Sequence, residues 1–301
     1  MAPMTLEPEE DLADTWTDDP SDHGSADTFP AGNGPAVLRT HAGAYRLRSL
    51  LAGPHRQVFL ADDLGRGGSV VVKVLPSRSP RPDHERRALE SLQIPGVVRL
   101  VDCGEVEGRP FLVLEHISGT RFPSLVPWPV LVARAQSLLD TVARMHAQDI
   151  AHGDLKPSNV LVTDDGAVAI IDLALASGGP LGDPRADPRR VYGTPAYMAP
   201  EMFSGAPASP ATDIYAIGVL LYEALAGFRP NESSGGMVAL VLARQSADPP
   251  PLRDHAPEVP ERLAWLIVQM LAREPADRPS AAEALEVLGD VALPPPEAGE
   301  G

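Results

Sequence analysis

The sequence predicts an α+β fold with two lobes, a small β-rich lobe that includes one helix and a larger α-helical lobe. Between residues 44 and 115, short apolar runs alternate with turn-rich pieces, which is typical of antiparallel strands joined by hairpins. From residue 120 to 291, apolar residues recur with helical spacing over longer segments. The pattern changes at residues 115–119, where we predict a hinge between the lobes.

Five strands are predicted in the small lobe, because each run is short, rich in apolar residues and bounded by turn signals. They are Tyr45–Leu50, Gln57–Ala61, Ser69–Leu75, Val97–Cys103 and Pro110–Glu115. A short helix, Pro82–Leu92, interrupts them. At about 100° per residue, Ala88, Leu89 and Leu92 lie on one apolar stripe of this helix, and Glu85 falls in its middle. A carboxylate on a buried face needs a cation, and Lys73 on the third strand is the natural partner.

Five helices are predicted in the large lobe from their periodicity. They are Val130–Gln148, Ala211–Ala226, Gly236–Gln245, Pro260–Ala272 and Ala281–Val291. The longest apolar stretch, Ile214–Phe228, is short and contains Glu223, which favours a buried helix over a membrane span. Because the sequence lacks a signal-peptide pattern and has Cys103 as its single cysteine, we expect a soluble, cytoplasmic chain.

Both ends are predicted to be tails, residues 1–43 and 292–301. Residues 1–30 carry nine acidic residues and no Lys or Arg, and so acidic a segment is expected to stay disordered. It is either an interaction or regulatory tail or a solvated leader, and we favour the leader. The net charge of −16, much of it in this segment, argues against nucleic acid as the main partner.

Lysine occurs only twice among the 25 basic residues, as Lys73 and Lys156. Lys156 lies in the segment His152–Asn159, which reads His-Gly-Asp-Leu-Lys-Pro-Ser-Asn. In such a composition, lysine is expected to remain where a compact ammonium can do what a planar guanidinium cannot. The two lysines therefore mark candidate sites of charge chemistry.

The polar residues of this segment predict a site for phosphoryl transfer. Asp154 can accept a proton from a hydroxyl nucleophile, and Lys156 can neutralise charge on a phosphoryl group during transfer. Asn159 can supply an oxygen ligand for Mg²⁺. Asp172, at the end of the following predicted strand, can supply a carboxylate for the same ion.

This segment and Asp172 resemble the catalytic loop and the metal-binding Asp of protein kinases. The resemblance covers roughly residues 45–290 and is closest to bacterial Ser/Thr kinases of the eukaryotic type. It implies a bilobal kinase fold, ATP as the phosphoryl donor, Mg²⁺ or Mn²⁺ as the metal, and Ser/Thr residues of proteins as acceptors. Such kinases usually also have a membrane span and an extracellular part, which we do not expect in this chain, and its net charge argues against a nucleic-acid partner.

A second motif, Gly193–Glu201, resembles the end of a kinase activation segment. Within it, Thr194 followed by Pro195 is similar to Ser/Thr kinases rather than to tyrosine kinases. The resemblance implies scaffold roles for four residues: Thr194, Glu201 paired with Arg278, and Asp213 hydrogen-bonded to the backbone of the catalytic loop.

The resemblance also implies a nucleotide site between the lobes. Lys73 would hold the α- and β-phosphates, and Glu85 would hold Lys73. The other implied residues are Leu51 and Gly53 in the phosphate loop, Val58, Val71 and Leu161 around adenine, Leu114 as gatekeeper, and the backbone of Glu115 and Ile117.

The sequence departs from the family pattern at the phosphate loop and after the metal-binding Asp. Of three glycine positions in the phosphate loop, only Gly53 is glycine, and the others are Leu51 and Arg56. Side chains there hinder the approach of backbone to phosphates, so we expect weaker ATP affinity. Asp172 is followed by Leu173-Ala174 rather than Phe-Gly, and alanine narrows the backbone freedom that glycine would give.

The activation segment departs as well. Gly153 stands where many kinases have the Arg that meets a phosphate on this segment. Between residues 173 and 193, the hydroxyl residues are Ser177 and Tyr192. The arginine that would bind the phosphate is missing, and so is a threonine that could carry it. We therefore predict activity that does not depend on activation-loop phosphorylation.

Three functions fit these observations. An active Ser/Thr protein kinase is favoured, since Lys73, Glu85, Asp154, Lys156, Asn159 and Asp172 are all present. A pseudokinase that binds nucleotide or a partner without transfer is the main alternative, because the glycine loop is incomplete. A small-molecule phosphotransferase is disfavoured by the Gly193–Glu201 segment, which in kinases shapes a peptide-binding surface.

Overall fold

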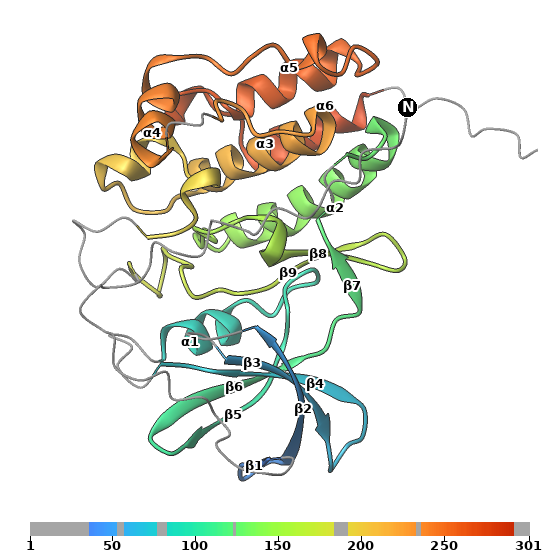
Figure 1. Ribbon diagram of the computed structural model, residues 1–301, viewed down its shortest axis with the longest axis vertical. Helices are drawn as coiled ribbons and strands as arrows, with labels where there is room; N and C mark the ends of the chain where they lie inside the picture. The colour runs from blue at the N-terminus through green and yellow to red at the C-terminus, as the bar shows by residue number, and fades with distance from the viewer. Residues whose placement is uncertain are drawn as a thin grey trace, which may run out of the picture.

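The computed structural model describes residues 36–52, 57–76, 83–122, 125–183, 192–232 and 236–291. Figure 1 shows two lobes, a smaller one with strands β1–β6 and helix α1, and a larger one that contains the remaining helices. This confirms the predicted α+β architecture.

The small lobe is built on one antiparallel sheet with the order β1-β2-β3-β4-β6-β5. Its strands are Val37–Arg39 (β1), Ala44–Ala52 (β2), Gln57–Asp63 (β3), Ser69–Val74 (β4), Leu100–Val106 (β5) and Arg109–Glu115 (β6). One apolar cluster, which includes Tyr45, Phe59 and Phe111, covers one face of the sheet. On the other face the sheet packs against helix α1, His84–Ser91. A second apolar cluster on this face continues into the large lobe.

Strand β1 corrects the prediction that the acidic tail extends to residue 43. Leu38 of this strand is buried, and residues 37–39 pair with residues 44–46 of β2. The Tyr45 hydroxyl then donates to Asp102 at 2.8 Å, which joins the start of β2 to β5. A three-residue edge strand takes its stability from its neighbours, so its own composition carried no clear signal. The rest of that tail, residues 1–35, and the tail at 292–301 lie outside the described residues.

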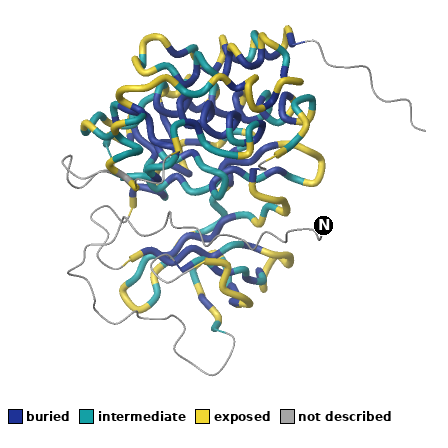
Figure 2. Tube along the Cα trace, turned by 45° about the horizontal axis from the view of Figure 1, so that its top comes forward, coloured by how far each residue is buried: buried dark blue, intermediate teal, exposed yellow. Residues whose placement is uncertain are grey.

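The large lobe contains five helices close to the predicted ranges. They are Trp128–His146 (α2), Pro210–Ala226 (α3), Gly236–Ser246 (α4), Glu261–Met270 (α5) and Ala281–Gly289 (α6). Helix α3 begins with a capping box between Ser209 and Thr212 and ends at Gly227, whose φ is 83°. Most of α3 is buried, in agreement with the predicted core helix. Figure 2 shows how buried residues fill the interior of this lobe.

No helix among the described residues is both long and apolar enough to cross a membrane.

A small three-stranded sheet lies beside the lobe boundary, with the order β7-β8-β9. Its strands are Gly119–Arg121 (β7), Val160–Thr163 (β8) and Val168–Ile170 (β9). Because Gly119 already belongs to β7, the connection between the lobes is shorter than the predicted hinge of 115–119. Strand β8 follows directly after Asn159, and β9 ends just before Asp172. Because β8 and β9 are adjacent strands, the sheet brings Asn159 and Asp172 to the same region of the molecule (Figure 1).

Candidate active site

Asp213 of helix α3 holds the loop that carries Asp154 through hydrogen bonds to the backbone of the loop. The Asp213 carboxylate is 1% exposed and accepts hydrogen bonds from the backbone N–H of His152 at 2.7 Å and of Gly153 at 2.9 Å. Its Oδ2 also accepts from His146 Nε2 at 3.0 Å. These contacts agree with the expected bonds from Asp213 to the loop backbone, since a buried carboxylate needs such donors.

His152 ties this loop to strand β9. Its ring is fully buried, Nδ1 accepts the Asp154 N–H at 3.1 Å, and Nε2 lies 3.2 Å from the Ile171 carbonyl oxygen. Because the backbone N–H can only donate and the carbonyl can only accept, the ring is neutral with its proton on Nε2. Sequence reasoning assigned no role to His152 or His146, although His152 lies within the motif itself.

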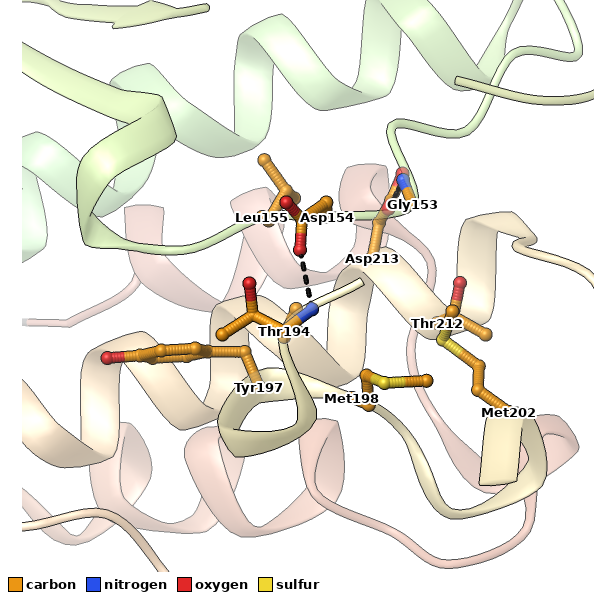
Figure 3. Close-up of a pocket in the computed structure, with 10 residues that line it drawn as sticks. Gly153, Asp154, Leu155, Thr194, Tyr197, Met198, Met202, Thr212 and Asp213 are labelled. Atoms are coloured by element: carbon orange, nitrogen blue, oxygen red, sulfur yellow. Dashed lines mark hydrogen bonds between the residues drawn. The ribbon is translucent and has the colours of Figure 1, made fainter. Parts of the chain in front are cut away.

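Three polar residues meet at the Asp154 carboxylate. Oδ1 accepts the Thr194 N–H at 2.8 Å, and Oδ2 accepts Asn159 Nδ2 at 3.2 Å. Lys156 Nζ lies 3.4 Å from Oδ2 and donates to Thr194 Oγ1 at 2.8 Å. Figure 3 shows the Asp154–Thr194 contact at the rim of a small pocket whose lining includes Met198. The structure therefore brings Asp154, Lys156 and Asn159 together, as the sequence predicted, and adds Thr194, for which the resemblance implied only a scaffold role.

The second charged cluster joins the two lobes. Lys73 Nζ on β4 lies 2.6 Å from Glu85 Oε1 on α1 and 2.8 Å from Asp172 Oδ1 after β9. The Lys73 and Glu85 side chains are 6% and 5% exposed, whereas that of Asp172 is 23% exposed. The predicted partnership of Lys73 with Glu85 is present, and Asp172 joins it from the opposite lobe. The attraction between these opposite charges offsets part of the cost of removing Lys73 and Glu85 from water.

The backbone at Asp172 directs its carboxylate towards Lys73. Asp172 has a φ of 63°, in the left-handed region, and its Oδ1 accepts the Ala174 N–H at 3.3 Å. Asp adopts this region more readily than most residues because its short side chain can bond to the local backbone. Ala174 itself is not among the described non-glycine residues with positive φ. The backbone of residue 174 therefore suits alanine and does not need the positive φ that glycine allows.

Part of the predicted nucleotide-binding set lies in one apolar cluster. Val71 on β4 and Leu114 on β6 are direct cross-strand partners. Both pack in the same cluster as Ile117. Val58 on β3 is paired with Lys73, and Leu161 stands on β8 of the other lobe.

The predicted hinge and phosphate-loop residues do not share one environment. The Glu115 N–H donates to the Arg99 carbonyl at 3.0 Å, and the Glu115 carboxylate accepts the Arg99 N–H at 2.8 Å. Leu51 is 54% exposed at the end of β2, where a glycine was expected. Gly53 and Arg56 lie outside the described residues.

The predicted pair of Glu201 and Arg278 is a bidentate ion pair. Arg278 Nη1 and Nη2 lie 2.7 and 2.8 Å from the two carboxylate oxygens of Glu201. The Arg278 side chain is 0% exposed and also donates to the carbonyls of Ala211, Ala272 and Arg273. Its guanidinium lies 4.9 Å from the centre of the Tyr215 ring. The pair therefore joins the segment after Met198 to helix α3 and to the loop before α6.

Replacing Glu201 by Gln should destabilise the chain by about 3–5 kcal/mol, because the buried Arg278 would lose its counter-charge. Urea unfolding followed by circular dichroism measures this difference. Asp290→Asn is the matched control, since Asp290 forms an exposed pair with Arg262, 68% and 54% exposed, and should cost at most about 1 kcal/mol. Equal stabilities of the two variants would contradict the scaffold role of Glu201.

Comparison with known proteins agrees with this geometry. Residues 47–287 match the protein kinase domain family. The chain is 35% identical over 263 residues to the serine/threonine-protein kinase PknA of Mycobacterium tuberculosis. It is 32% identical over 273 residues to the serine/threonine-protein kinase Pkn1 of Myxococcus xanthus, and 33% identical over 259 residues to the DNA damage-responsive serine/threonine-protein kinase RqkA of Deinococcus radiodurans.

The aligned regions cover 81 to 85% of this chain but only 39 to 60% of those relatives. The similarity thus concerns the part of each relative that corresponds to the two lobes described above. Because the family match spans most of the chain and contains both charged clusters, the chain belongs to the protein kinase domain family.

Proposed function

We propose that this chain transfers the terminal phosphoryl group of ATP to Ser or Thr hydroxyls of protein substrates. The observation that carries the proposal is the joint presence of two clusters. One holds Asp154 against Lys156 and Thr194, and the other holds Lys73 between Glu85 and Asp172. Phosphoryl transfer depends mostly on positioning and charge neutralisation, which these clusters supply.

Within this proposal, Asp154 orients the acceptor hydroxyl and takes its proton. The Asp154 side chain is 13% exposed, so a hydroxyl can reach it. Lys156, 20% exposed, lies beside it and can offset negative charge on the phosphoryl group in transfer. Thr194 holds both residues through its N–H and its hydroxyl. Water or a non-protein acceptor would meet the same groups, so the acceptor class must be tested directly.

Asn159 and Asp172 fit a hard divalent cation such as Mg²⁺ or Mn²⁺. Asn159 Nδ2 donates to the Asp154 main-chain oxygen at 2.8 Å, so the ligand atom would be the amide oxygen, which accepts the Ser158 hydroxyl at 3.4 Å and has a second lone pair. The Ile171 N–H donates to the Asn159 carbonyl at 2.9 Å, which brings these two strand ends together. The described residues contain no group of three or more His, Cys, Asp or Glu side chains suited to a metal. Mg²⁺ usually takes one or two protein carboxylates together with waters and phosphates, and it would neutralise phosphate charge when bound.

The direct test is transfer of radiolabelled phosphate from ATP to a protein acceptor, with Mg²⁺ or Mn²⁺, followed by phosphoamino-acid analysis. Labelled phosphoserine or phosphothreonine is expected, in line with the names of the relatives above. A labelled small molecule without labelled protein would instead favour the small-molecule phosphotransferase.

A pseudokinase is the second candidate, and the exposed Leu51 at the phosphate loop favours it. A chain of this kind would bind ATP or its analogues without transfer. Nucleotide binding measured by calorimetry, together with the absence of labelled product for both metals, would select this alternative.

We also propose that activity does not depend on phosphorylation of the activation segment. Helix α1 already holds this segment through His84 Nε2, which donates to the Ala176 carbonyl at 2.6 Å, and through Arg87, which donates to the Pro180 carbonyl at 2.9 Å. From the other lobe, Ala151 and Ser177 exchange backbone hydrogen bonds of 2.9 Å. These contacts hold residues 176–180 of the segment, which lie within the described residues, without the help of a phosphate.

The Gly153 position supports the same proposal. Its φ is 80°, and a Cβ added there would lie 2.7 Å from the Leu175 carbonyl oxygen. An arginine at this position would therefore be strained in its backbone and would collide with the main chain. The phosphate receiver that many kinases carry here is incompatible with this conformation.

Replacing Ser177 by Ala should leave phosphoryl transfer unchanged to within about two-fold, because Ser177 is 3% exposed and cannot be reached by another enzyme. Its hydroxyl donates only a single bond, of 3.0 Å, to the Ala208 carbonyl. Initial rates of wild type and variant, before and after phosphatase treatment, measure this. A variant that lost its activity while keeping its melting temperature would overturn the proposed independence.

A further inference from the structure

A buried arginine, Arg244 on helix α4, contacts the segment that follows Thr194. Arg244 is 2% exposed, and its Nη1 donates to the carbonyls of Pro195 at 3.1 Å and Met198 at 2.5 Å. Its Nη2 donates to the carbonyl of Ala196. One side chain from a helix distant in sequence thus satisfies three carbonyls within four consecutive residues.

The charge of Arg244 has no carboxylate partner among the described residues, in contrast to Arg278, which is paired with Glu201. The Arg244 guanidinium instead faces the ring of Tyr215, with 5.6 Å to the ring centre. Its Nε has no hydrogen-bond partner among the residues that the structure describes. Burial away from water lowers the pKa of Arg244 from its ordinary value. Burying a cation in this way is costly, and an apolar side chain of similar volume would fill the space without that cost.

The three carbonyls belong to a segment that is coupled to the candidate base. At its start, the Thr194 N–H donates to Asp154 at 2.8 Å and the Thr194 hydroxyl accepts from Lys156 at 2.8 Å. Figure 3 shows this segment, with Tyr197 and Met198, forming the wall of the pocket below Asp154. Any displacement of residues 195–198 would therefore move Thr194 and disturb the place where an acceptor hydroxyl meets Asp154.

We propose that Arg244 is a positioning residue for the protein acceptor, which holds residues 195–198 so that the acceptor hydroxyl reaches Asp154. The inference rests on the phosphoryl transfer proposed above. It assigns to Arg244 an effect on the acceptor side of the reaction and none on the binding of ATP, because Lys73, Glu85 and Asp172 lie in a separate cluster. Arginine suits this role because its planar fork can reach several carbonyls at once.

The test compares Arg244→Met, Arg244→Lys and the control Arg253→Met, which changes an exposed arginine of the same lobe. For Arg244→Met we expect kcat/KM for the protein acceptor to fall about 10²-fold, as small displacements of positioning groups can cost. The KM for ATP should stay within about two-fold, and Arg244→Lys should show a smaller fall, because one ammonium cannot replace the fork. Where Arg244→Met fails to fold, the Arg244→Lys variant carries the comparison.

Hydrogen–deuterium exchange of the peptide around Thr194 gives a readout that needs no activity. Faster exchange in both Arg244 variants, but not in Arg253→Met, is expected. Wild-type protein that transfers no phosphate would refute the proposed function, and exchange would still decide whether Arg244 holds the segment. The inference is overturned by unchanged exchange or by acceptor kinetics equal to those of the control. It is also overturned if the KM for ATP rises as much as the KM for the acceptor.

Discussion

Asp154→Asn is expected to lower the rate of phosphoryl transfer by about 10²–10⁴-fold, the usual contribution of a positioned general base. The amide has nearly the same size as the carboxylate, so the KM for ATP should change little. The result would separate loss of proton acceptance from loss of binding.

The local contacts explain why an amide cannot replace this carboxylate. Asp154 Oδ1 accepts the Thr194 N–H, a role that the amide oxygen of Asn could keep. Oδ2 accepts from Asn159 Nδ2 at 3.2 Å and lies 3.4 Å from Lys156 Nζ. An NH₂ group there would face two donors and accept from neither. The variant would thus lose the negative charge and turn a donor towards Lys156.

The measurement is labelled phosphate transfer by wild type and Asp154→Asn under the same metal and ATP concentrations. Asp164→Asn is the matched control, because Asp164 is an exposed residue of the turn between β8 and β9. Rates for Asp154→Asn equal to those of the control would rule out the role of Asp154 and, with it, the proposed kinase mechanism.

The second large effect is expected for Lys73→Arg, which keeps the positive charge but should reduce transfer by about 10²-fold, as misplacement of a positioning group can. The Lys73 ammonium contacts Glu85 at 2.6 Å and Asp172 at 2.8 Å in a space that leaves its side chain 6% exposed. A guanidinium is larger, planar and directional, so it cannot occupy the same point between two carboxylates from different lobes. Its displacement would separate α1 from the Asp172 segment.

Kinetics and thermal unfolding of Lys73→Arg and Glu85→Gln, with the double variant, would measure the coupling between these residues. A coupling energy of about 0.5–3 kcal/mol is expected for residues in direct contact. Arg48→Lys serves as a control, since Arg48 is 51% exposed and pairs with Asp62 at the surface. A fully active Lys73→Arg enzyme would show that the ammonium itself is not required.

The elements with strong periodicity could be predicted from the sequence, and those that depend on neighbours could not. Helices α2, α3 and α5 match their predicted ranges to within two residues at each end, because their apolar stripes recur over several turns. Strand β1 was missed because three residues at a sheet edge are stabilised by pairing with β2. Glu85 was identified as a buried acid from its place on a helical stripe, and the structure places it beside Lys73.

The sequence by itself determined the two lobes and the chemical groups of the site, because local periodicity and the spacing of Asp154, Lys156 and Asn159 are properties of short segments. Only the tertiary structure decided the contact of Lys73 with Asp172, the restraint of Asp154 by Thr194, and the burial of Arg244. These contacts join residues that are 40 or more positions apart in the sequence, such as Lys73 and Asp172, which are 99 positions apart. They depend on how loops without periodicity pack between elements, and no local pattern encodes that packing.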